Sequence, residues 1–212
     1  MPATLLHLVR HGEVHNPDRV LYGRIPGFHL SELGARMATM AADSLAGHNV
    51  TALYASPLER AQESAAPWSK NFGLEIQTEE RIIEPTNKFE GQKSSFNAGL
   101  LLKPSVWPWI INPMRPSWGE PFADIAARVR ADMDDAWQSA DSGEVVMVSH
   151  QSPIWMATRS INNLRLPHHP GKRRCTLSSI TSFERAGGVW REVAYREPAG
   201  ELLAASTDLG AV

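Results

Sequence analysis

Short apolar runs alternate with longer segments of helical period along most of the chain. Three runs, residues 5–9, 52–55 and 145–148, consist mainly of apolar side chains, with His7 as a polar exception, and end at polar or turn residues. Continuous apolar runs of this length are typical of strands buried on both faces in a parallel sheet. Residues 179–183 and 189–195 alternate more and are joined across Gly187 and Gly188, which predicts a late hairpin that adds antiparallel character to the sheet.

Between these runs lie segments with apolar residues at helical spacing. Three of these helices begin at a serine that is placed to cap them: Ser31, Ser56 and Ser152. Proline follows Ser56 and Ser152, as is common at the first helical position. The predicted helices cover residues 31–46, 56–72, 121–138 and 152–161.

Strands that alternate with helices indicate an α/β fold, here a three-layer α/β/α sandwich with a mainly parallel sheet. A chain of 212 residues with 42% apolar content is long enough for one substantial core, so we predict a single domain over residues 1–196. Residues 85–119 are rich in proline and tryptophan and predict an inserted cap over the site. Its tryptophans form either the cap's own small core or a surface that stacks on substrate. Residues 197–212 are small and polar and predict a flexible tail.

Composition narrows the class of partner. A net charge of −2 and a pI near 6.4 give no overall field that would attract nucleic acid or an anionic membrane, so anion binding must come from a local group of cations. The single cysteine, Cys175, cannot form an internal disulfide and is interpreted as structural. No basic leader or apolar stretch of membrane length is present. We therefore expect a cytoplasmic protein without nucleic-acid or membrane partners, whose oligomeric state the sequence leaves open.

Candidate chemistry begins where the first strand ends, at Arg10, His11 and Gly12. A neutral imidazole is a good nucleophile toward phosphorus, and a neighbouring guanidinium can hold two phosphate oxygens. The glycine permits a sharp turn and a close approach to a ligand. A surface turn of the same composition is the alternative for these three residues taken alone.

Two more ionisable residues occupy equivalent positions. Arg60 lies in the first turn of the helix after the second strand, and His150 directly follows the strand that ends at residues 148–149. Ligands bind outside the carboxyl ends of the strands in an open α/β sheet. Taken together, these positions favour an active site over a solvated arginine and a loop histidine.

Three motifs resemble the histidine phosphatase superfamily, also called the phosphoglycerate mutase-like family. They are Leu-Val-Arg-His-Gly-Glu at residues 8–13, Ser-Pro-Leu-Glu-Arg-Ala-Gln-Glu-Ser-Ala at residues 56–65, and Val-Ser-His at residues 148–150. The matching segments extend from residue 5 to about residue 153, which leaves the cap and the tail unaligned.

The resemblance implies a metal-independent phosphatase without a cofactor, acting on a small-molecule phosphoester. His11 would attack phosphorus and carry the phosphoryl group, and Arg10, Arg60 and His150 would bind its oxygens. Glu84 matches the family's general acid, which protonates the leaving oxygen and then activates water.

The sequence also departs from the family pattern. The segment after Glu84 is shortened, so Glu90 remains a second candidate for the acid. Asn16 is the nearest counterpart of the family's phosphate-binding asparagine, and Gln151 replaces a glycine often found after the late histidine; both are predicted to bind substrate. The basic loop at residues 168–174 is interpreted as solvated, with contact to an acidic substrate as the alternative.

Two alternatives to hydrolysis remain. A phosphoglycerate-type phosphomutase would return the phosphoryl group to a reoriented intermediate and keep water out. A non-catalytic module that binds a phosphorylated ligand would have lost His11, an arginine or the acid, and all of these are present.

Overall fold

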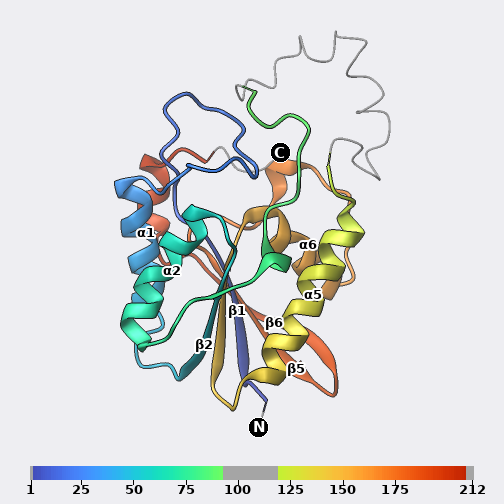
Figure 1. Cartoon of the computed structure of the whole chain (residues 1–212). Coiled ribbons are helices and arrows are strands. Elements are labelled where there is room, and N and C mark those ends of the chain that lie inside the picture. Colours follow the sequence, from blue (N-terminus) through green and yellow to red (C-terminus); the bar gives the residue numbers. More distant parts are fainter. Residues whose placement is uncertain (1, 93–118, 209–212) are drawn as a thin grey trace.

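The computed structural model describes residues 2–92 and 119–208 and contains one mixed sheet (Figure 1). Its strand order is β3-β2-β4-β1-β5-β6. The first four strands in chain order are mutually parallel, whereas the last two pair in antiparallel fashion as the predicted hairpin. The strands are β1 (Leu5–Arg10), β2 (Val50–Ala55), β3 (Gln77–Thr78), β4 (Glu144–Ser149), β5 (Ile180–Ala186) and β6 (Val189–Arg196).

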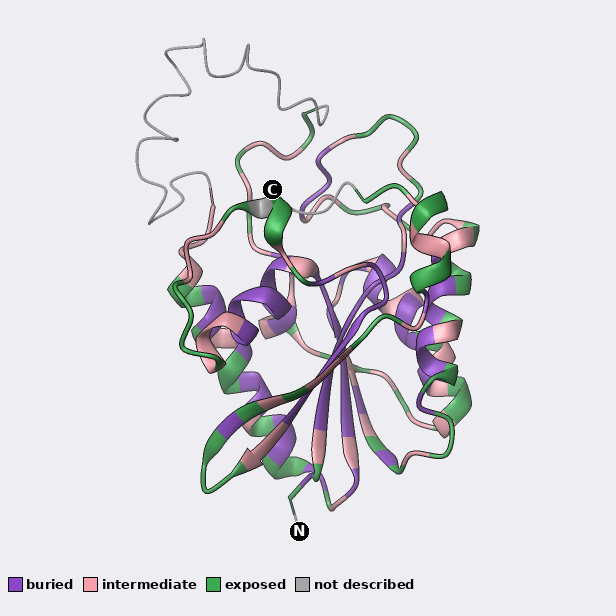
Figure 2. Ribbon diagram, turned by 180° about the vertical axis from the view of Figure 1, so that it is seen from behind, coloured by how far each residue is buried: buried purple, intermediate pink, exposed green. Residues whose placement is uncertain are grey.

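Helices cover both faces of the sheet, α1 and α2 on one side and α5 and α6 on the other (Figure 1). Each side has its own apolar core, and buried residues run the length of the central strands (Figure 2). The predicted three-layer α/β/α fold is confirmed. The helices are α1 (Glu32–Asp43), α2 (Glu59–Phe72), α5 (Phe122–Ser139) and α6 (Gln151–Ile161), with short 3₁₀ helices η1 (Glu80–Ile82), η3 (Pro170–Lys172) and η4 (Gly200–Ala205).

The serines predicted as caps before α2 and α6 do not cap those helices. Helix α2 begins at Glu59, with Leu58 at its N-cap and no side-chain cap, because the Ser56 hydroxyl is hydrogen-bonded to His150 instead. Ser152 lies inside α6, which begins one residue earlier. By contrast, Ser31 caps α1 as predicted and accepts a hydrogen bond from the Gly34 N–H.

The described part of the predicted flexible tail is folded against the domain. Residues 200–205 form η4, and Leu202 and Leu203 pack against Met37 and Leu177. The Thr207 N–H donates a hydrogen bond to Glu13 Oε1 at 2.6 Å. The prediction of a loose tail is therefore wrong for residues 197–208, because apolar side chains and backbone contacts hold this segment against α1 and the turn after β1.

The predicted cap is described only at its two ends. Residues 85–92 leave the domain beside the site, and Asn87 pairs with Gly119 on the returning chain. Trp107, Trp109 and Trp118 lie outside the described residues, so their role stays a prediction. Among the helices of residues 2–92 and 119–208, none combines the length and the apolar character needed to cross a membrane.

Sheet register explains how the candidate residues meet. Arg10 pairs with Ser149 across β1 and β4, and Ala55 pairs with Val148 across β2 and β4. The three strands therefore end at the same level. The residues that follow them, His11, Ser56 and His150, are delivered to one edge of the sheet.

Candidate active site

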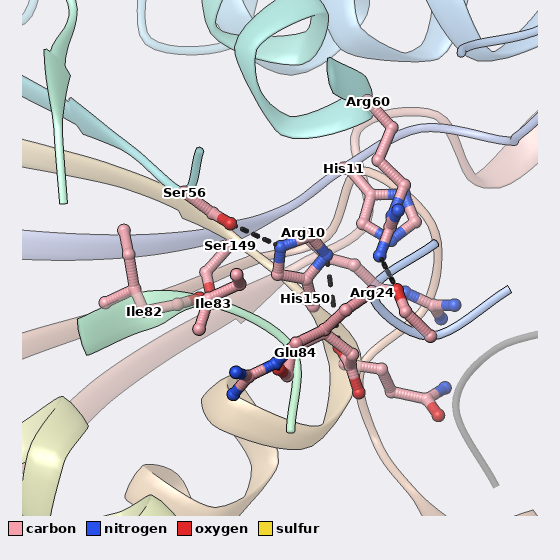
Figure 3. A network of polar contacts seen from close by, with 12 residues as sticks. Arg10, His11, Arg24, Ser56, Arg60, Ile82, Ile83, Glu84, Ser149 and His150 are labelled. Carbon is pink, nitrogen blue, oxygen red and sulfur yellow. Dashed lines mark hydrogen bonds and ion pairs between the residues drawn. The ribbon is translucent and has the colours of Figure 1, made fainter. Parts of the chain in front are cut away.

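Two histidine rings form the centre of the site, with centroids 5.1 Å apart. His11 follows β1 and His150 follows β4, and both side chains are buried. Figure 3 shows His150 next to Glu84, with His11 and Arg60 beside them. The structure thus brings together five of the predicted residues, Arg10, His11, Arg60, Glu84 and His150, as the resemblance implied.

His11 is held as a neutral imidazole with a defined tautomer. Its Nδ1 lies 2.7 Å from the Gly12 carbonyl oxygen. A carbonyl can only accept, so Nδ1 carries the proton and the lone pair is on Nε2. Burial and the charges of Arg60 and Arg10 hold the pKa of His11 well below its usual value. Nε2 is therefore available as a nucleophile.

Arg10 and Arg60 present buried N–H groups to the site. Arg60 Nη2 donates to the Gly23 carbonyl at 2.7 Å, while its Nε and Nη1 have no hydrogen-bond partner among the described residues. Its guanidinium also lies over the Tyr22 ring, 4.7 Å from the centroid. Arg10 Nε is likewise buried without a partner. Buried donors of this kind are costly unless an acceptor binds them, which indicates an anion site.

His150 is oriented by Ser56, a residue that the sequence assigned to a helix cap. Its Nε2 lies 2.7 Å from Ser56 Oγ. Its Nδ1 is buried, has no hydrogen-bond partner within residues 2–92 and 119–208, and lies 3.9 Å from Glu84 Oε2. Burial and the positive charge of Arg60 lower the pKa of His150 well below its usual value. If the serine donates to Nε2, the neutral ring carries its proton on Nδ1 and offers it to an anion.

Glu84 is a buried carboxyl group whose Oε1 has no hydrogen-bond partner in the part of the chain that the structure describes. Burial raises the pKa of Glu84 to about 7, although Arg60 and Arg173 act in the opposite direction. Two arginines hold the backbone around Glu84. Arg24 Nε donates to the Glu84 carbonyl at 2.5 Å, and Arg128 Nη2 donates to the carbonyl of the preceding residue, Ile83, at 2.8 Å. A carboxyl group that titrates near neutral pH can both give and take a proton.

Glu90 and Asn16 are engaged elsewhere. Glu90 Oε1 accepts hydrogen bonds from the backbone N–H groups of Asn87 and Arg24, at 3.0 and 3.2 Å. Both ends of the Asn16 amide bond to the backbone of Val20. The structure does not bring either residue into the lining of the pocket that contains His11. Glu84 is therefore the better placed of the two candidate acids.

The pocket has an empty volume of about 250 Å³, and Gln151 is part of its wall. Gln151 Oε1 accepts a hydrogen bond from Arg173 Nη1 at 3.1 Å. Arg173 also donates from Nε to His168 Nε2 and borders a neighbouring hollow of about 400 Å³. The basic loop is thus not solvated throughout, because Arg173 turns toward the site. The pocket is lined by Arg10, His11, Leu21, Tyr22, Gly23, Glu84 and Gln151.

Sequence reasoning missed Tyr22, Arg24 and Asp208, which also contact site residues. These residues lie in irregular segments or near the chain terminus, and nothing in their local sequence marks them. Cys175, by contrast, is a buried thiol whose pKa burial raises to about 11, in agreement with a structural role. The combination of a neutral imidazole nucleophile, buried guanidinium donors and a protonated carboxyl group suits phosphoryl transfer.

Comparison with known proteins agrees with this chemistry. The family model described as histidine phosphatase superfamily (branch 1) matches residues 6–198. An uncharacterised protein of Mycobacterium tuberculosis is 46% identical over 196 residues, 92% of this chain and 97% of that protein. Phosphoserine phosphatase 1 of Hydrogenobacter thermophilus is 29% identical over 70% of this chain and 72% of its own length.

Solved structures show the same fold. A mycobacterial glucosyl-3-phosphoglycerate phosphatase in complex with VO₃ superposes with a TM-score of 0.75 at 24% identity, covering 90% of this chain and 98% of that one. The family match spans nearly the whole described domain, including every residue of the histidine and arginine cluster. The chain therefore belongs to branch 1 of the histidine phosphatase superfamily.

Proposed function

We propose that this protein hydrolyses a small phosphomonoester through a phosphohistidine intermediate on His11. The observation that carries the proposal is the environment of His11. Its neutral ring, with the Nδ1 proton held by the Gly12 carbonyl, lies next to two buried arginines whose N–H groups are not all bonded by the described residues. The names of relatives with phosphatase activity support hydrolysis as the reaction class.

The first step transfers the phosphoryl group to the enzyme. Arg10, Arg60 and the Nδ1–H of His150 bind the phosphoryl oxygens, whose negative charge persists through the loose transition state. His11 Nε2 forms a bond to phosphorus while the bond from phosphorus to the ester oxygen breaks. Glu84 gives its proton to that leaving oxygen, so the alcohol departs neutral and Glu84 becomes a carboxylate.

The second step returns the enzyme to its starting state. The Glu84 carboxylate takes a proton from water as the water oxygen bonds to phosphorus and the phosphorus–nitrogen bond breaks. Inorganic phosphate leaves, and both His11 and Glu84 recover their initial protonation. A pKa of about 7 suits a group that must act as acid in one step and as base in the next.

The test is phosphate release from p-nitrophenyl phosphate and a panel of small phosphoesters, with EDTA present, for the natural protein and His11→Ala. We expect the variant to lose at least about 10³-fold in kcat/KM, because the nucleophile is absent. His15→Ala is the matched control, since His15 lies on an exposed part of the same loop. Quenching in alkaline detergent during turnover should trap an acid-labile phosphoryl group on the natural protein and on His15→Ala, but not on His11→Ala.

Other outcomes would favour the alternatives. A probable phosphoglycerate mutase of Yersinia enterocolitica is 28% identical over 82% of this chain, which makes phosphoryl exchange the second candidate. Exchange between phosphoesters without phosphate release would show a phosphomutase. Binding of phosphate without turnover or exchange would show a non-catalytic module.

A further inference from the structure

Asp208, near the end of the described chain, contacts the arginine that the proposed mechanism places on the phosphoryl group. Its Oδ2 accepts from Arg10 Nη1 at 2.7 Å and its Oδ1 accepts from Arg10 Nη2 at 2.5 Å. The two parallel bonds form the bidentate geometry in which a guanidinium binds a carboxylate most tightly. No step of the proposed reaction uses Asp208, so its role needs a separate account.

The remaining N–H groups of Arg10 show which edge of the guanidinium is available. Nη1 also donates to the Cys175 carbonyl, at 2.7 Å, so both of its hydrogens are engaged. Nη2 gives one hydrogen to Asp208, and Nε has no hydrogen-bond partner among the described residues. A guanidinium has five N–H donors in a planar fork. The edge formed by Nε–H and the second Nη2–H is therefore the edge left for an anion.

The position of Asp208 agrees with this division. Arg10 lines the pocket together with His11, whereas Asp208, which the structure describes, is not part of that lining. The Arg10 side chain is fully buried, while that of Asp208 is 38% exposed. The carboxylate thus occupies the Nη1–Nη2 edge of the guanidinium from a partly exposed position and leaves the Nε–Nη2 edge free.

The segment that carries Asp208 is itself anchored. Leu202 and Leu203 of η4 pack against α1, and the Thr207 N–H bonds to Glu13 in the turn after β1. These contacts hold Asp208 against the end of β1 and the turn that follows it, where Arg10 and His11 lie. The C-terminal segment is therefore part of the frame of the site.

From these contacts we infer that Asp208 is a positioning residue, which holds Arg10 so that its free edge binds the phosphoryl group. This inference rests on the proposed function, because it assigns Arg10 to that group. In the opposite role, the carboxylate would compete with phosphate for Arg10, and its removal would raise the affinity for phosphate. A positioning residue raises phosphate affinity and turnover, whereas a competitor lowers both.

The experiment compares Asp208→Asn, Asp208→Glu and a chain that ends after Thr207 with the natural protein. Removing the carboxylate frees the guanidinium to rotate, so kcat/KM for p-nitrophenyl phosphate should fall about 10- to 100-fold, mainly through KM. The affinity for inorganic phosphate, measured by calorimetry, should fall in parallel. Asp208→Glu should recover part of both. Glu201→Gln, at an exposed position of the same segment, is the control and should change neither.

Thermal unfolding separates positioning from folding. The truncated chain keeps η4 and its packing, so its melting temperature should stay close to that of the natural protein. Equal or higher phosphate affinity in Asp208→Asn and in the truncated chain would overturn the inference. Phosphate affinity tests Asp208 without turnover, and His11→Ala tests the proposed function without Asp208, so failure of one is distinguishable from failure of the other.

Discussion

His11, His150 and Glu84 share a buried environment that favours the uncharged form of each. Burial lowers the pKa of both histidines and raises that of the glutamate to about 7. The positive charges of Arg10 and Arg60 reinforce the effect on the histidines and oppose it on Glu84. At slightly acidic pH the site thus contains an imidazole with a free lone pair on Nε2 and a carboxyl group that carries a proton, which is the pairing that phosphoryl transfer to histidine requires.

The assignment of Glu84 predicts a dependence on the leaving group. Glu84→Gln removes the proton donor, so kcat/KM for alkyl phosphates should fall about 10²- to 10⁴-fold. Activated aryl phosphates release an aryl oxide that needs no protonation, so their kcat/KM should fall by less than about 10-fold. Initial rates on a series of esters with increasing alcohol pKa measure the difference.

Glu90→Gln is the matched control for that series. The Glu90 carboxylate bonds to backbone N–H groups outside the pocket, so its loss should lower kcat/KM for all esters by a similar, small factor. Selectivity for poor leaving groups in Glu90→Gln, with none in Glu84→Gln, would assign the acid to Glu90.

At the scale of elements, the turn after β1 lies directly against the first turn of α1. A Cβ at Gly12 would come within 2.3 Å of the Gly34 carbonyl oxygen, and a Cβ at Gly34 within 2.0 Å of the Glu13 carbonyl oxygen. Gly12 is therefore required for backbone packing against α1, a reason different from the sharp turn and the approach to a ligand expected from the sequence. This packing holds the turn that carries His11 against α1.

Gly34→Ala should accordingly destabilise the protein strongly. The new methyl group would clash with the backbone of Glu13, which cannot move without shifting α1 or the turn that carries His11. We therefore expect a loss of about 3 kcal/mol or more in the free energy of unfolding. Gly47→Ala is the comparison, since its Cβ would meet no described residue within 4 Å, and the positive φ of 87° is what opposes the change. That variant should lose about 1–2 kcal/mol. Urea denaturation measures both, and equal losses would contradict the packing argument.

At the scale of the whole molecule, the buried acid makes stability depend on pH. The pKa of Glu84 is about 7 in the folded protein against 4.5 for the free side chain. Between these values the unfolded chain has released a proton that the folded protein keeps, so this group's contribution to stability falls as pH rises. His11 and His150 act with the opposite sign, because their lowered pKa values reduce stability as pH falls below 6.5.

Comparing Glu84→Gln with the natural protein isolates the carboxyl term, since the histidines are common to both. Raising the pH from 5 to 8 should shift the difference in unfolding free energy by about 2 kcal/mol in favour of the variant. Urea unfolding at several pH values measures this difference. A constant difference across the range would mean that Glu84 is not buried as a neutral acid.

Much of the fold and the core of the site could be predicted from the sequence. Apolar runs and helical periods report local burial, which is why the layers, the parallel strands and the hairpin agree with the structure. Arg10 ends β1, His11 and His150 directly follow β1 and β4, and parallel strands bring their carboxyl ends to one edge. Local sequence therefore determined that these three residues meet at one edge of the sheet.

Only the tertiary structure decided what those residues bond to. Ser56 has the sequence of a helix cap but orients His150, 94 positions away, and Asp208 belongs to a segment that resembles a loose tail but holds Arg10, 198 positions away. A polar side chain bonds to whichever partner the fold places beside it, and the ionisation of Glu84 depends on how completely distant segments exclude water from it. Neither quantity is encoded in the spacing of neighbouring residues, because both arise only when segments far apart in the chain meet.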